Sequence, residues 1–197
     1  MNYAKLVSVV LITCCTFTAC KPKLDTNSKD WNCKKIDDEQ ICVPSSWVFK
    51  PQDKALFFTY LDNKDKNSYF AILKHNKTAS GLNTVKYLKE LYTILQQPDT
   101  LELSRGYTLK KLTSDKMVTY HNEIYTSIDN KLYITYSILF EKDDNLFEIC
   151  LKIDEKHSSH YQTLFRDILF RFRYKNQPVF TPEEKINKID TIDMSKL

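Results

Sequence analysis

The stretch from residue 117 to 153 constrains the fold most, because its apolar residues recur at every second position. In its middle segment they are Leu132, Ile134, Tyr136, Ile138 and Phe140. In the last segment they are Phe147, Ile149, Leu151 and Ile153, with Glu148, Cys150 and Lys152 on the opposite face. In the first segment they are Val118, Tyr120, Ile124 and Ile128. A period of two is typical of strands with one buried face, so three antiparallel strands sharing one buried side are predicted.

Asparagine and aspartate build the predicted turns, since the chain contains only two glycines. Asp129-Asn130 and Asp143-Asp144-Asn145 separate the three alternating segments, and these residue types tolerate positive φ. Upstream, residues 55–60 and 68–75 read as two further strands around a polar turn at 62–67. The segment 117–153 is therefore predicted to be a meander that follows a separate hairpin.

Two segments have helical periodicity instead. The first runs from Thr84 to Gln97 and ends before Pro98, with apolar positions at Val85, Leu88, Leu91, Tyr92 and Leu95. The second runs from about Ser158 to Phe172, with a stripe of Tyr161, Leu164, Phe165, Ile168 and Phe172. The second helix is expected to pack across the buried side of the strands. The predicted fold class is α+β, an antiparallel β-sheet with helices packed on one face.

The N-terminal segment has the pattern of an export signal. Lys5 supplies a positive charge, residues 6–12 are apolar and too few to span a bilayer stably, and the segment closes with Phe17-Thr18-Ala19-Cys20. This ending resembles a lipobox, in which small residues precede a cysteine that receives a diacylglycerol, although Phe17 stands where leucine is commonest. Residues 1–19 are therefore predicted to be a removable signal, and Cys20 the lipid-bearing first residue of a membrane-anchored chain.

The rest of the chain divides into three parts. The polar residues 20–30 read as a tether, and residues 31–174 as a single α+β domain. Residues 175–197 read as an irregular tail. Within it, Thr181-Pro182-Glu183-Glu184 resembles a capping box with proline at the first helical position, which is compatible with a short helix.

The cysteines outside the signal suggest an oxidising compartment. Cys33 and Cys42 bracket two short arms and an acidic turn, and a hairpin there would bring their Cβ atoms close enough for a disulfide. Cys150 is left over as a free thiol. A zinc site is the rival interpretation of the three cysteines, but the chain has no Cys-x-x-Cys or Cys-x-x-His spacing.

The composition and motifs give little support for nucleic-acid binding or catalysis. The formal net charge is +4, and basic residues are scattered among acids without a run of five like charges. His157 and His160 share one face of a helix start and could ligate a metal, yet a tight site needs more ligands. His121 and Glu123 share a strand face, but no nucleophile accompanies them. Two glycines cannot supply the glycine-dependent hydrolase and nucleotide motifs, so no catalytic residue, cofactor or metal is predicted.

The order of elements resembles the PsbP-like family, which includes a lumenal photosystem II subunit, a nuclear Ran-binding relative and short bacterial lipoproteins. The residues that carry the resemblance are Val43-Pro44-Ser45-Ser46-Trp47, Tyr69-Phe70-Ala71-Ile72, Tyr87-Leu88, Tyr133-Ile134-Thr135-Tyr136 and Phe165-Arg166-Asp167-Ile168-Leu169-Phe170. They extend over about residues 40–173 and are packing patterns rather than a site signature. The resemblance implies an α/β/α sandwich and a non-enzymatic scaffold or binding role, and it transfers no functional residue.

The expected function is a lipid-anchored, non-enzymatic module of the cell envelope that binds or assembles with a protein on the exported side of a membrane. An immunity or inhibitor lipoprotein that neutralises a toxin is the alternative. A toxin gene beside this one would favour the alternative, whereas an envelope-assembly cluster would favour the first hypothesis. An enzyme comes third because no linked catalytic set is present.

Replacing Cys20 with alanine is expected to abolish membrane retention and leave the fold intact, because the acyl chains are attached outside the domain. Incorporation of labelled fatty acid and the partition of the protein between membrane and soluble fractions measure this. Equal labelling of the variant and the natural protein would show that Cys20 is not the acceptor.

Overall fold

The computed structural model describes residues 31–61, 65–97 and 103–197, so the predicted signal, the tether and Cys20 lie outside the described residues. The elements are β1 (Trp31–Ile36), β2 (Glu39–Pro44), β3 (Ala55–Tyr60), β4 (Tyr69–Asn76), α1 (Lys77–Ser80), α2 (Thr84–Leu95), β5 (Leu103–Ser114), β6 (Val118–Ile128), β7 (Lys131–Lys142), β8 (Asn145–Asp154), η2 (Glu155–His157), α3 (Ser158–Leu169), β9 (Arg173–Tyr174), β10 (Gln177–Pro178), β11 (Ile186–Ile192) and η3 (Met194–Lys196). No helix within the described ranges is long and apolar enough to cross a membrane.

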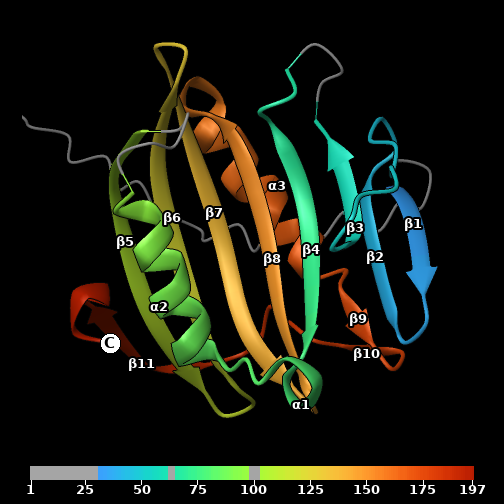
Figure 1. Cartoon of the computed structure of the whole chain (residues 1–197). Coiled ribbons are helices and arrows are strands. Elements are labelled where there is room, and N and C mark those ends of the chain that lie inside the picture. Colours follow the sequence, from blue (N-terminus) through green and yellow to red (C-terminus); the bar gives the residue numbers. More distant parts are fainter. Residues whose placement is uncertain (1–30, 62–64, 98–102) are drawn as a thin grey trace, which may run out of the picture.

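An antiparallel sheet of seven strands, in the order β11-β5-β6-β7-β8-β4-β3, forms the centre of the molecule (Figure 1). The predicted meander is confirmed as β6, β7 and β8. Asp129, Asn130 and Asp143 adopt positive φ values of 49°, 61° and 51° in its two turns, as their residue types led us to expect. A second, four-stranded sheet has the order β1-β2-β9-β10.

Helices lie on both sides of the large sheet, so the expectation that they pack on one face is wrong. Figure 1 shows α2 in front of the sheet and α3 behind it. We call these two sides the α2 face and the α3 face. The layers nevertheless form the α/β/α sandwich that the sequence resemblance implied, and the fold class is α+β.

The prediction that the three meander strands share one buried side is also wrong. In the register of β6 and β7, Glu123 is paired with Tyr136 and Ile124 with Thr135. The apolar even-numbered residues of β7 therefore lie on the α3 face, whereas those of β6, such as Ile124, lie on the α2 face. Because each face has its own helix, apolar periodicity alone could not identify which face each strand buries.

The core on the α3 face is large and aromatic. Phe140 stacks on Phe147 with ring centroids 5.3 Å apart, and Phe172 approaches both rings edge-on. α3 adds Phe165 and Ile168 to this core. The helix ends three residues earlier than predicted, at Leu169, but Phe172 is still fully buried.

The core on the α2 face is smaller. Leu88 of α2 packs with Leu109, Leu139 and Met194, and all four side chains are buried. α2 begins where the Asn83 side chain accepts a hydrogen bond from a backbone amide of the first turn. A residue close to the C-terminus, Met194, thus helps to hold α2 against the sheet.

The C-terminal segment belongs to the domain, which corrects the predicted boundary at residue 174. β11 pairs with β5, and Val179 and Met194 are buried. The sequence Thr181 to Glu184 forms a turn rather than a helix. The physical reason is that the Glu184 carboxylate accepts a hydrogen bond from the hydroxyl of Ser114 instead of capping a helix start.

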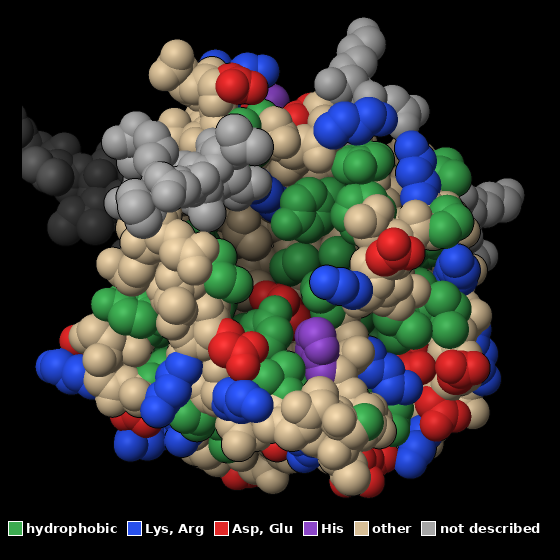
Figure 2. All heavy atoms as spheres, viewed as in Figure 1, with side chains coloured by type: hydrophobic (Ala, Val, Ile, Leu, Met, Phe, Trp, Pro, Cys, Tyr) green, Lys and Arg blue, Asp and Glu red, His purple; other side chains and the backbone are tan. Residues whose placement is uncertain are grey.

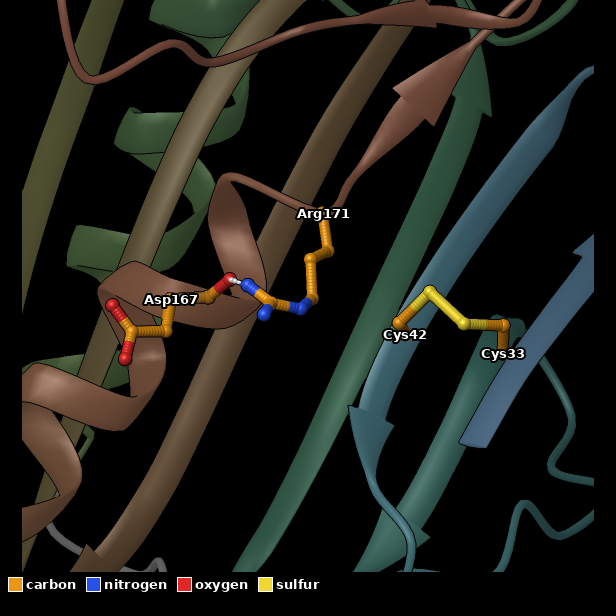
Figure 3. Close-up of a disulfide and its surroundings, with 4 residues drawn as sticks. All are labelled: Cys33, Cys42, Asp167 and Arg171. Atoms are coloured by element: carbon orange, nitrogen blue, oxygen red, sulfur yellow. Dashed lines mark hydrogen bonds between the residues drawn. A yellow bond between two sulfur atoms is a disulfide. The ribbon is translucent and has the colours of Figure 1, made fainter. Parts of the chain in front are cut away.

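The small sheet is joined to the rest of the molecule by side-chain packing and by a cation–π contact. Cys33 and Cys42, directly paired in the β1–β2 hairpin, are linked by a disulfide (Figure 3). Figure 3 also shows Arg171, which donates to the carbonyl oxygen of Asp167 at the end of α3. The same guanidinium stacks 3.8 Å from the ring centre of Trp31 in β1. That the protein reaches an oxidising compartment where this disulfide forms stays a prediction.

Phe165→Ala is expected to destabilise the domain by about 3 to 5 kcal/mol, because the side chain is 6% exposed and its truncation leaves a cavity between α3 and the sheet. Arg166→Ala, next to it on the solvent side, is the matched control and should change stability by less than about 0.5 kcal/mol. Denaturant unfolding measures both. Equal midpoints for the two variants would contradict this packing of α3.

Candidate functional site

A hollow lies on the α2 face beside α2, because this helix covers only part of that face of the sheet (Figure 1). A cavity of about 610 Å³ opens between α2 and the strands β3 and β4, of which β3 is the edge strand. Figure 2 shows this hollow from the front, with apolar side chains around it and an acidic side chain at its bottom. Cavities of a few hundred Å³ with apolar walls and few polar groups are typical of binding sites.

Three aromatic side chains of β3 and β4 form one wall. Phe58 lies edge-on to Tyr60 at 5.0 Å and packs against Tyr69 at 5.6 Å, both measured between ring centroids. Ala71 and Leu73 continue the wall along β4. β3 has aromatic residues on both of its faces, and those not needed for the α3-face core line the cavity.

α2 supplies the opposite wall. Tyr87, Leu91, Ile94 and Leu95 line the cavity from this helix. They occur three or four residues apart, so they lie on one side of α2. Ile94 is 53% exposed at the mouth of the cavity. An apolar side chain exposed at the mouth of an aromatic cavity is suited to contact with a bound molecule.

The floor is polar and comes mainly from β8. Glu148, Cys150 and Lys152 alternate with core residues and therefore lie together on the α2 face, as the sequence predicted. Thr126 of β6 and Thr135 of β7 lie beside them. The sequence did not show that α2 would cover this face and enclose the three β8 residues in a cavity.

Glu148 is held by a contact across the cavity. The hydroxyl of Tyr87 donates a hydrogen bond to its carboxylate. Burial raises the pKa of Glu148 above its ordinary value, and the hydrogen bond from Tyr87 works in the opposite direction. Burial and the neighbouring Glu148 charge also raise the pKa of Tyr87. Tyr87 therefore remains the donor, and the contact joins α2 to β8.

Cys150 is the free thiol of the described residues and lies on the cavity floor. Burial and the Glu148 charge raise its pKa well above the ordinary value. A thiol acts as a nucleophile in its ionised form, and activated cysteines have lowered pKa values. The floor thus disfavours the ionised state that nucleophilic catalysis requires.

The mouth of the cavity carries positive charge. The ammonium group of Lys66 lies 4.6 Å from the ring centre of Tyr60, and that of Lys50 lies 5.1 Å from the same ring. Lys54 lines the cavity near them, together with Asp53. Basic groups beside an aromatic wall favour a ligand with an apolar part and a negative charge.

The histidines singled out by sequence lie away from this cavity. His121 and Glu123 share the α3 face, but His121 is hydrogen-bonded to Thr119 and Glu123 to Tyr125, so they do not form an acid–base pair. Burial and the Lys110 charge lower the pKa of His121 to about 4. His157 and His160 are exposed. Across the described ranges, no three His, Cys, Asp or Glu side chains are placed to hold a metal ion.

Among Tyr125, Tyr133 and Tyr161, only Tyr133 is close to complete burial. It is 2% exposed on the α2 face, with the Lys152 ammonium 5.8 Å from its ring centre. Tyr125 and Tyr161 are half-buried against the α3-face core. These rings belong to the packing of the sheet rather than to the mouth of the cavity.

A solved structure shares this architecture. Cyanobacterial PsbP (CyanoP) from Synechocystis sp. PCC 6803 matches with a TM-score of 0.55 at 13% identity, over 76% of this chain and 95% of that chain. The fold is PsbP-like. Two matches are weaker. PA94 from Pseudomonas aeruginosa, a protein of unknown function, has a TM-score of 0.44 at 10% identity over 79% of this chain and 99% of that chain. LpqN from Mycobacterium tuberculosis, which is involved in cell envelope biogenesis, has a TM-score of 0.41 at 12% identity over 66% of this chain and 79% of that chain.

Comparisons of sequence add nothing to this result. No family model matches the chain, and no curated protein matches it. At 13% identity, the likeness to CyanoP establishes the PsbP-like fold and no particular function.

Glu148→Gln is expected to remove part of the pH dependence of stability. Since burial raises the folded-state pKa of Glu148, its contribution is fully present below the ordinary value of 4.5 and is lost as the pH rises through the raised value. The natural protein should therefore lose stability relative to the variant as the pH increases. Urea unfolding between about pH 4 and about pH 8 measures the difference, and parallel curves would contradict a raised pKa.

Proposed function

We propose that this chain is a lipid-anchored, non-enzymatic binding module of the cell envelope, and that the cavity between α2 and β3 holds a segment of a partner protein. One observation carries the proposal: a cavity of about 610 Å³ combines an aromatic wall with a small polar floor. Such sites bind through apolar burial, and their few polar groups orient what is bound.

The chemistry of the floor favours binding over catalysis. Burial raises the pKa of Glu148 and of Cys150, which favours the neutral form of both groups. A carboxyl group that already accepts a hydrogen bond from Tyr87 is a poor general base for the thiol. These groups are suited to donating and accepting hydrogen bonds with a bound segment.

The walls and the mouth suggest what that segment contains. Aromatic residues are enriched at the centres of protein interfaces, where they contact apolar side chains of the partner. Here Phe58, Tyr60 and Tyr69 would contact an apolar side chain, while Lys54 and Lys66 would attract a neighbouring acidic residue. We therefore expect a partner segment with an apolar residue next to an acidic one.

The anchor is supported by the N-terminal sequence. Phe17-Thr18-Ala19-Cys20 resembles a lipobox, and two acyl chains on one residue are enough for stable membrane attachment. About ten residues separate Cys20 from β1, and a tether of this length would let the cavity meet partners close to the membrane surface.

Ile94→Glu, at the mouth of the cavity, is expected to weaken partner binding by about tenfold or more, because it puts a charge where an apolar contact forms. Val48→Glu is the matched control, since Val48 is also an exposed aliphatic residue, 64% exposed, and does not line the cavity. Ala71→Phe fills the cavity from its β4 wall without changing charge. Melting temperatures verify that the variants are folded.

The measurement is affinity capture from native membranes with the full chain, followed by quantitative mass spectrometry. A partner of the cavity is lost with Ile94→Glu and Ala71→Phe and retained with Val48→Glu. If every captured protein is retained by all three variants, or lost equally from all of them, the cavity is not the binding site.

A further inference from the structure

β11 forms one edge of the seven-stranded sheet, outside β5 (Figure 1). Within the described part of the chain, no strand pairs with its other side. An edge strand presents unpaired backbone amides and carbonyls, which another strand can satisfy. The bulge in β11 precedes Lys188, and the register from Lys188 to Ile192 is continuous.

This edge also exposes apolar surface. Ile186 is 43% exposed and Ile189 is 61% exposed. Both lie on the α3 face, as the pairing of Ile186 with Ser114 and of Ile189 with Leu112 shows. Proteins usually guard an exposed edge against association, yet here two isoleucines lie along it.

The sequence of β11 is complementary to itself when read in the opposite direction. It reads Ile186-Asn187-Lys188-Ile189-Asp190-Thr191-Ile192. Within the regular register that begins at Lys188, the lysine before Ile189 matches the aspartate after it. We propose that β11 pairs antiparallel with β11 of a second copy of this chain, about a two-fold axis at Ile189, so that the two sheets become one.

In this arrangement Lys188 lies opposite the partner's Asp190, and Asp190 lies opposite the partner's Lys188. Lys188 and Asp190 are both on the α2 face, and their charged groups are 2.9 Å apart within one chain. Pairing would place these two charged groups beside the Lys188 and Asp190 side chains of the second copy. Ile189 would contact its own counterpart on the α3 face. Cross-strand pairs of both kinds stabilise antiparallel sheets.

Charge selects this register over its neighbours. A two-fold axis normal to the sheet places the α2 faces of the two copies on one side and their α3 faces on the other. Only registers in which opposed residues lie on the same face are therefore possible. The adjacent register on one side places Lys188 opposite the partner's Lys188. The adjacent register on the other side places Asp190 opposite the partner's Asp190. The register centred on Ile189 instead pairs opposite charges, which points to a second copy as the partner.

The register can be measured in the full chain by cysteine cross-linking in native membranes under mild oxidation. In the proposed dimer the Cβ atoms of the two residues at position 189 are about 5 Å apart, close enough for a disulfide. Ile189→Cys should therefore run as a dimer on a non-reducing gel. Thr191→Cys is the matched control on the same strand and face, and its two copies would lie about 13 Å apart.

Charge reversal provides the second measurement, on the full chain in detergent by sedimentation. Lys188→Asp and Asp190→Lys should each weaken self-association by about tenfold or more, because each places like charges opposite one another. The double variant restores opposite charges and should associate like the natural protein. A mixture of the two single variants should form a mixed dimer.

Three results would overturn the proposal. They are a monomeric natural protein at all concentrations, equal cross-linking from positions 189 and 191, and a double variant no better associated than the single ones. None of these results bears on the cavity, so the proposed binding function stands or falls separately.

Discussion

The structure depends on β7 and β8, which are buried on both of their faces. Phe140 and Ile149 lie in the α3-face core, while Leu139 and Cys150 are buried on the α2 face. A sheet of this kind needs cover on both sides, because exposing either face would return apolar surface to water. On the α3 face, α3 and the small sheet provide it. On the α2 face, α2 is too short to cover all seven strands, and the uncovered part is the cavity.

Local sequence patterns predicted the elements of the meander and its turns, because alternation and turn residues act over a few positions. They could not predict β11. Its isoleucines at 186, 189 and 192 are spaced by three, which is not the period of a strand, and β11 forms because β5 offers it an edge. The orientation of β6 was predicted wrongly for a related reason. Its apolar residues, Tyr120 among them, pack under α2, whose position is fixed by contacts distant in sequence.

The candidate site, too, could be predicted from the sequence only in part. The alternation of β8 placed Glu148, Cys150 and Lys152 on one face, and this was correct. That the face is enclosed depends on Tyr87, which is 61 positions from Glu148 in the sequence and is brought to it by the packing of α2. One local signal was present: β3 has aromatic residues on both faces, although an edge strand with one buried face needs them on one. The additional aromatic residues of β3, Phe58 and Tyr60, belong to the aromatic wall of the cavity.

The cavity and the β11 edge lie toward opposite ends of the sheet, so pairing of two copies leaves both cavities open. They are nevertheless connected through packing. β11 leads into η3, where Met194 is 2% exposed and contacts the cluster that contains Leu88 of α2. The same helix carries Tyr87 and Ile94, which line the cavity. Strand pairing that orders β11 would therefore restrain the C-terminal segment that supports α2, and with it the wall that faces a bound segment.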